Sequence, residues 1–119
     1  MNFSFSNNLR LLTHKHFYGV INKQHKICIF SMILYYYNNS LWHPRIGIAI
    51  SKKNVKLAHE RNRIKRLIRE SFRYHKNDLC AMDLVLMVTN EINCMDNSAI
   101  MRGLGILWSH HLIKSAQDY

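Results

Sequence analysis

The sequence is poor in glycine and proline, the residues that interrupt helices and strands, and it has no long apolar run. Its 119 residues include only four glycines and one proline, and no Pro- or Gly-rich linker divides them. We therefore predict one domain spanning residues 1–119. No stretch approaches the roughly 20 consecutive apolar residues that a membrane span needs. The N-terminus lacks the basic-then-apolar pattern of a secretory signal, so we expect a cytoplasmic protein without a membrane-spanning segment.

Cysteines are scarce and unpaired. Cys28, Cys80 and Cys94 are widely spaced and form no C-x-x-C pair. This pattern argues against a disulfide framework and agrees with a reducing compartment. The eight histidines include His14 and His16, which are two residues apart and do not match the spacing of metal ligands on a helix. We therefore expect no metal site and interpret these histidines as surface residues.

Acidic residues are also few, with seven Asp and Glu against 17 Lys and Arg and a formal charge of +10. The acids are scattered along the chain. A protein nuclease would need clustered carboxylates for magnesium, or side chains placed for acid–base work. We therefore expect no catalytic residue on this chain. The excess positive charge instead predicts a polyanionic partner, either nucleic acid or an anionic membrane surface.

Hydrophobic periodicity predicts an α/β sandwich, in which helices pack on a single sheet. After an N-terminal arm over 1–12, the expected elements are a helix over 13–21 with Thr13 as its possible N-cap, strands over 26–37 and 45–51, a helix over 55–75, a strand over 83–89 and a last helix. The last helix begins near Asp96 or Asn97, since either residue can cap it. On the long helix, Leu57 is expected on the same apolar side as Ile64 and Ile68.

Most of the positive charge lies on the long helix and just before it. Residues 52–76 contain ten basic residues and only two acids. A helical projection places Arg61 and Arg63 on the shoulders of a polar arc opposite the apolar stripe. The arc consists of Asn62, Lys65, Arg66, Arg69 and Arg73. An ordinary solvated face would alternate in sign, whereas pairs such as Lys65 and Arg69 repel each other. This arc therefore predicts contact with a nucleic acid backbone.

Aromatic residues gather outside the basic helix. Phe17 lies on the first helix, and Tyr35, Tyr36 and Tyr37 end the first strand. An exposed Phe beside an exposed Tyr would form a groove in which single-stranded bases stack. Burial in the core is the alternative for any one of these side chains. Because successive strand residues face opposite ways, at least one of the tyrosines is expected at the surface.

The segment ERNRIKRLIRESFR, at residues 60–73, resembles the protein subunit of bacterial ribonuclease P. The triplet Arg61-Asn62-Arg63 within a basic helix is the signature of that family. The resemblance extends without a gap from residue 43 to residue 73, and AMDLVLMV at 81–88 matches the strand that follows. It covers nearly the whole chain.

The resemblance implies a subunit of the ribonucleoprotein endonuclease that removes 5′ leaders from precursor tRNA. In that family the RNA is the catalyst and uses Mg²⁺, which the protein does not hold by itself. The protein would pair one-to-one with the catalytic RNA, through Lys52, Lys53, Arg61, Asn62, Arg63, Lys65, Arg66, Arg69 and Arg73. The leader would lie between the sheet and the first helix, at Phe17 and Tyr35.

The resemblance also refines the fold. It implies a mixed sheet of about four strands in the element order α-β-β-(β)-α-β-α. It further implies a left-handed strand–helix–strand crossover, against the general right-handed rule.

Three other functions stay open on the residues alone. A small ribosomal protein or RNA chaperone would carry a similar charge and bind structured RNA without affecting precursor cleavage. An amphipathic basic helix could serve a membrane surface. A protein-only nuclease would cut RNA in magnesium without an RNA subunit.

Overall fold

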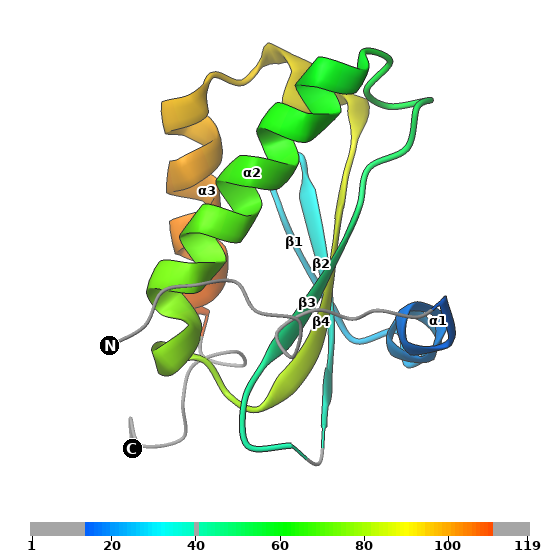
Figure 1. Cartoon of the computed structure of the whole chain (residues 1–119), viewed down its shortest axis with the longest axis vertical. Helices are drawn as coiled ribbons and strands as arrows, with labels where there is room; N and C mark the ends of the chain where they lie inside the picture. The colour runs from blue at the N-terminus through cyan, green and yellow to red at the C-terminus, as the bar shows by residue number, and fades with distance from the viewer. Residues whose placement is uncertain (1–13, 40, 111–119) are drawn as a thin grey trace.

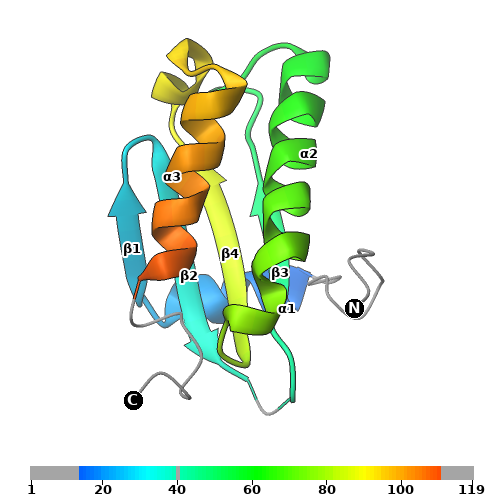
Figure 2. The ribbon, with the colours of Figure 1, turned by 90° about the vertical axis from the view of Figure 1, so that its left-hand side faces the viewer.

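The computed structural model describes residues 14–39 and 41–110, so the predicted arm over 1–12 and the possible cap at Thr13 lie outside the described residues. A four-stranded sheet carries helices on both faces (Figures 1 and 2). Helix α1 (His14–Asn22) lies on one face, and helices α2 (Ala58–His75) and α3 (Asn97–Ser109) lie on the other. The expected sandwich of one sheet and packed helices is confirmed.

The sheet is mixed, with strand β4 (Met82–Val88) at its centre. The strand order is β1-β2-β4-β3, where β1 is Lys26–Ile29, β2 is Met32–Asn38 and β3 is Arg45–Ala49. β2 runs antiparallel to both β1 and β4, whereas β3 runs parallel to β4. Helices cover both faces of β4, which explains why its sequence, MDLVLMV, is almost continuously apolar.

The parallel pair is joined by a left-handed crossover. In Figure 2 both strands run upward, α2 lies in front of the sheet, and the chain passes from β3 on the right to β4 on the left. With the helix facing the viewer, a right-handed connection would move to the right. The handedness implied by the family resemblance is therefore present.

One strand expected over 26–37 is in fact a hairpin. β1 and β2 pair through a register in which Ile29 lies opposite Met32, so Phe30 and Ser31 form the turn between them. Phe30 has a φ of 54°, in the left-handed region, and its side chain is largely exposed. The single-strand prediction was wrong because this turn contains none of the Gly, Asn or Asp residues that usually mark one.

The long helix begins three residues later than expected, at Ala58. Leu57, predicted on the apolar side, is the N-cap residue and is 57% exposed. Val55 takes the buried position instead, within a loop that closes through a hydrogen bond from Val55 N to Ser51 O. The helical periodicity of the sequence therefore continues on the N-terminal side of Ala58, where the backbone is extended and not helical.

The main core lies between the sheet and the α2–α3 pair. α2 contributes Ile64, Ile68 and Phe72, while α3 contributes Leu104 and its neighbours on the same stripe. Asp96 caps α3 by accepting a hydrogen bond from the Ala99 amide at 2.8 Å, as expected. The helical period would extend this stripe to Leu112, which lies outside the described residues. Within residues 14–39 and 41–110, no helix has the length and apolar character needed to cross a membrane.

Candidate nucleic-acid interface

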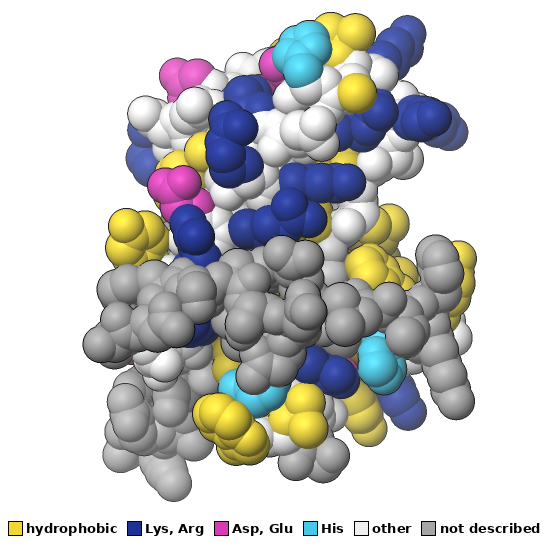
Figure 3. Space-filling view, in the orientation of Figure 1, with side chains coloured by type: hydrophobic (Ala, Val, Ile, Leu, Met, Phe, Trp, Pro, Cys, Tyr) yellow, Lys and Arg dark blue, Asp and Glu magenta, His cyan; other side chains and the backbone are white. Residues whose placement is uncertain are grey.

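The outer face of α2 carries the predicted cationic arc. Asn62, Arg66 and Arg69 are exposed, whereas Lys65 and Arg73 are half-buried. Ile64 and Ile68 are fully buried on the opposite side, so core packing fixes the direction in which the arc faces. Figure 3 shows Lys and Arg side chains gathered over α2 and the loop before it, with few acidic side chains among them.

Arg61 connects the arc to the preceding loop. Its Nη1 donates to the carbonyl oxygens of Val55 and Lys56, both at 2.9 Å. The N-cap of α2 makes no side-chain capping bond, so Arg61 stabilises the entry to the helix from within its first turn. A residue predicted only for RNA contact therefore also holds the backbone that carries the neighbouring lysines.

Arg63 is held between two helices. Its Nε and Nη2 donate to Glu60 Oε1 at 3.1 and 2.9 Å, and its Nη1 donates to Asn97 Oδ1 at the start of α3. These bonds fasten the N-terminal part of α2 to the first turn of α3. They also neutralise Glu60, which would otherwise repel a polyanion beside the arc.

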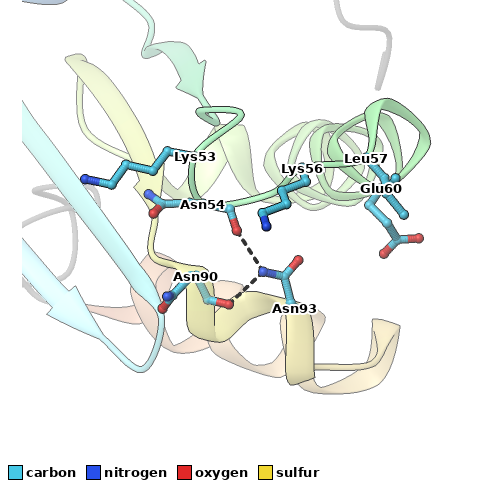
Figure 4. A pocket seen from close by; sticks show the side chains of 7 residues that line it. All are labelled: Lys53, Asn54, Lys56, Leu57, Glu60, Asn90 and Asn93. Atoms are coloured by element: carbon cyan, nitrogen blue, oxygen red, sulfur yellow. Dashed lines mark hydrogen bonds between the residues drawn. The ribbon is translucent and has the colours of Figure 1, made fainter.

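The loop over residues 51–57, which we call the lysine loop, presents Lys52, Lys53 and Lys56 to solvent. The loop is tied to the rest of the fold at several points, which reduces the entropy lost when these lysines bind a partner. Asn54 Nδ2 donates to Val88 O at 3.0 Å, at the end of β4. Asn93 Nδ2 donates to Asn54 O at 2.7 Å, from the 3-10 helix η3 (Asn90–Cys94) (Figure 4). A hollow of about 480 Å³ lies between this loop and η3.

Phe17 lies on the opposite side of the sheet, where α1 packs. Val20 and Val85 are the buried centre of this contact, with Phe17 and Tyr35 half-buried around them. Gly47 and Tyr35 are the neighbours of Val85 on the two flanking strands. The Phe17 ring lies directly against Gly47. The two predicted aromatic residues therefore share one sheet face, on either side of β4.

Lysines accompany the tyrosines of this face. Lys26 Nζ lies 5.9 Å from the ring centroid of Tyr35, and Lys23 Nζ lies 4.8 Å from that of Tyr37. Tyr37 is 40% exposed, which confirms that at least one of the three tyrosines reaches the surface. Ammonium groups over aromatic rings provide both charge and stacking surface, the combination that single-stranded nucleic acid binds.

An ion pair joins β3 to β4 at one end of this sheet face. Arg45 donates from Nε and Nη2 to the two carboxylate oxygens of Asp83, at 2.9 and 2.7 Å, across the β3–β4 pair. Asn39 Nδ2 donates to the same carboxylate at 2.9 Å. The hydrogen bond from Arg45 to Asp83 raises the pKa of the guanidinium, although burial opposes that shift. The Arg45 side chain is thus paired with a neighbouring strand of the sheet.

The described side chains contain no group of three or more His, Cys, Asp or Glu that could hold a metal ion. Cys28 and Cys94 are exposed free thiols, and Cys80 is half-buried.

Several residues that organise these surfaces were absent from the sequence-based predictions. A glycine inside a strand is itself a sign of close backbone approach, so Gly47 carried a local signal. The sequence held no comparable signal for Asn93 and Asn54, because their contact joins segments 39 residues apart.

The fold and these surfaces define a small, basic α+β protein with one strongly cationic helix. The family model of Ribonuclease P matches residues 5–112. The chain is 47% identical over 108 residues to the ribonuclease P protein component of Photorhabdus laumondii, and equally to that of Proteus mirabilis; the alignments cover 91% of each chain.

Solved structures agree with the sequence relatives. The RNase P protein of Staphylococcus aureus superposes with a TM-score of 0.78 at 31% identity, covering 82% of this chain and 90% of that one. A mutant of that protein, described as defective in mRNA degradation activity, gives a TM-score of 0.83 at 29% identity, with 89% and 90% covered.

The chain belongs to the ribonuclease P protein family. Its role is that of the auxiliary protein subunit of the ribonuclease P endoribonuclease, which processes the 5′ end of tRNA. Of the functions considered from the sequence, this is the one that family membership supports.

Proposed function

We infer that the protein binds the catalytic RNA through the outer face of α2 and the lysine loop. The observation that supports this most strongly is the exposure of Asn62, Arg66 and Arg69 on a helix whose opposite side is locked into the core. Exposed guanidinium groups suit bidentate contact with phosphates. Lys52 and Lys53 extend the surface beyond the helix start, and the half-buried Lys65 and Arg73 belong to the same arc. Arg61 and Arg63 contribute charge while holding the elements on either side in place.

The 5′ leader of precursor tRNA lies, in this proposal, on the opposite sheet face beside α1. Phe17 and Tyr35 provide aromatic surface there, and Lys23 and Lys26 provide charge close to the tyrosine rings. One protein molecule would thus contact two RNAs through two different faces. This arrangement suits one-to-one pairing with the RNA subunit in the cytoplasm.

The chemistry belongs to the RNA subunit in this proposal. Mg²⁺ supplies the activated water and the charge stabilisation that phosphodiester hydrolysis needs, and the RNA holds it. The protein's own residues bind and orient the two RNAs. Their positive charge also offsets phosphate repulsion between enzyme and substrate, which lowers the magnesium concentration required.

Two double variants test the RNA-binding face. Arg66→Ala/Arg69→Ala removes two charges from α2, and the control Lys23→Ala/Lys26→Ala removes two charges from the leader side. Titration of labelled ribonuclease P RNA over a range of salt concentrations should show a slope lowered by about one to two units for the α2 pair alone. Equal effects of both pairs would mean that binding depends on net charge rather than on this face.

A further inference from the structure

The hollow between the lysine loop and η3 combines two kinds of chemical group. Lys53 and Lys56 supply ammonium groups, and asparagines supply side-chain amides from both of its walls. The residues that line it are Lys53, Asn54, Lys56, Leu57, Glu60, Asn90 and Asn93. Figure 4 shows Lys56 extending from the loop toward η3. Its volume of about 480 Å³ falls within the range of small-ligand sites.

The walls of the hollow are held in place by the protein itself. Asn93 Nδ2 donates both to Asn54 O at 2.7 Å and to Asn90 O at 2.8 Å, so one amide group links η3 to the lysine loop. These bonds use only the Asn93 nitrogen, and its Oδ1 remains an acceptor. The side-chain amide of Asn90 makes no hydrogen bond to another residue of the described chain and is exposed at the rim.

The single acid in the hollow is already paired. Glu60 accepts two hydrogen bonds from Arg63, and His59 Nε2 lies 3.5 Å from its other oxygen. A phosphate beside Lys53 and Lys56 therefore meets little opposing charge. Leu57, which is 57% exposed, adds an apolar surface against which a flat ring can pack.

We propose that this hollow binds one unpaired nucleotide of the ribonuclease P RNA. The ammonium groups of Lys53 and Lys56 hold its phosphate, and the amides of Asn90 and Asn93 hydrogen-bond the edge of its base. Side-chain amides match the paired donor and acceptor that a base edge presents, and RNA-binding proteins read unpaired bases in this way. The inference rests on the proposed function, because it places the nucleotide in the RNA that α2 binds.

The position of the hollow favours the RNA subunit over the 5′ leader as the source of this nucleotide. The hollow lies between the lysine loop and η3, beside the first turn of α2 (Figure 4), whereas Phe17 and Tyr35 lie on the α1 side of the sheet. A nucleotide here would extend the contact of α2 with its RNA to a second element, η3. That contact is specific for a base, whereas the arc on α2 is suited to phosphates.

The test uses the reconstituted complex of the full-length protein with ribonuclease P RNA. Asn90→Ala removes one amide without changing charge or breaking a described hydrogen bond, and Asn38→Ala, exposed at the end of β2, is the matched control. Chemical probing of Watson–Crick edges should show a base that the wild-type protein protects and Asn90→Ala leaves reactive. Affinity should fall about three- to tenfold, with an unchanged salt slope because no phosphate contact is lost.

Lys56→Ala completes the design, since it should lower the salt slope by about one unit. If Asn90→Ala shows the same base protection and the same affinity as the wild-type protein, the nucleotide site is overturned. This holds even if Lys56→Ala lowers the salt slope, because the hollow would then hold backbone phosphate only. Failure of the wild-type protein to bind this RNA would instead contradict the proposed function. Matching thermal unfolding of all variants separates these results from misfolding.

Discussion

The ring of Phe17 occupies the space that any side chain at residue 47 would need. A Cβ placed on Gly47 would lie 2.5 Å from Phe17 Cζ and 2.7 Å from Cε2, well inside van der Waals contact. The absence of a side chain at residue 47 of β3 therefore sets how closely the ring approaches the sheet. Because Gly47 and Tyr35 flank Val85 on the same face, this approach also fixes the position of Phe17 relative to the tyrosine.

Gly47→Ala should displace the Phe17 ring and weaken binding of precursor tRNA by the reconstituted complex. A lost base-stacking contact corresponds to about 1–3 kcal/mol, or at least about fivefold in affinity. Phe17→Ala should have the same effect, and neither variant should change the affinity for mature tRNA, which lacks the leader. Gly105→Ala is the control, since a Cβ there meets no atom within 4 Å. Equal losses for precursor and mature tRNA would mean that Phe17 is only a core residue.

Arg61→Ala should affect stability as well as RNA affinity. The change removes two hydrogen bonds to the lysine loop, at Val55 O and Lys56 O, so the free energy of unfolding should decrease by about 1–2 kcal/mol. Arg66→Ala, from an exposed position on the same helix, should lower the salt slope of RNA binding by about one unit while changing stability by less than about 0.5 kcal/mol. Urea unfolding of both variants measures the difference. Indistinguishable stabilities would refute the holding role of Arg61.

Ser71→Ala should loosen the packing of α2 against α3. Trp108 Nε1 donates to Ser71 Oγ at 2.8 Å in the buried interface, and the alanine would leave this donor without its acceptor. We expect a loss of about 1–3 kcal/mol in the free energy of unfolding. Trp42 is 85% exposed, so a Trp42→Phe background lets fluorescence report on Trp108 alone. Ser98→Ala, exposed on α3, should leave the transition unchanged; a similar shift in both variants would argue against the buried bond.

Arg45→Met should destabilise the protein by an amount that does not vary with pH near neutrality. The hydrogen bond with Asp83 raises the pKa of Arg45 above an ordinary value that is already strongly basic. A raised pKa contributes stability that is fully present below the unfolded-state pKa and is lost only as the pH rises through the folded-state value. The difference from wild type should therefore be about 1–3 kcal/mol and constant between about pH 6 and pH 9. Urea unfolding across that range measures it, and a marked slope would contradict this ion pair.

The sequence predicted well those features that depend on neighbouring residues. The cationic arc on α2 follows from a 3.6-residue period that the core enforces, so exposed Asn62, Arg66 and Arg69 could be placed without coordinates. Asp96 was recognisable as a cap because the capping bond reaches only three residues along the chain.

Features that depend on distant contacts could not be predicted in the same way. The hairpin turn at Phe30 uses a left-handed residue that is neither Gly nor Asn, so it had no compositional sign. The contact of Arg63 with Asn97, and that of Asn93 with Asn54, join segments more than 30 residues apart. For this reason the roles of Arg61 and Arg63 in holding neighbouring elements became apparent only from the fold.

The most direct test of the central claim is cleavage of a 5′-labelled precursor tRNA at low magnesium by ribonuclease P RNA, with and without this protein. We expect correct 5′ maturation only when both are present, because the protein binds and the RNA cuts. Cleavage by the protein alone, or RNA activity that is unchanged despite tight protein binding, would contradict the assignment of binding to the protein and catalysis to the RNA.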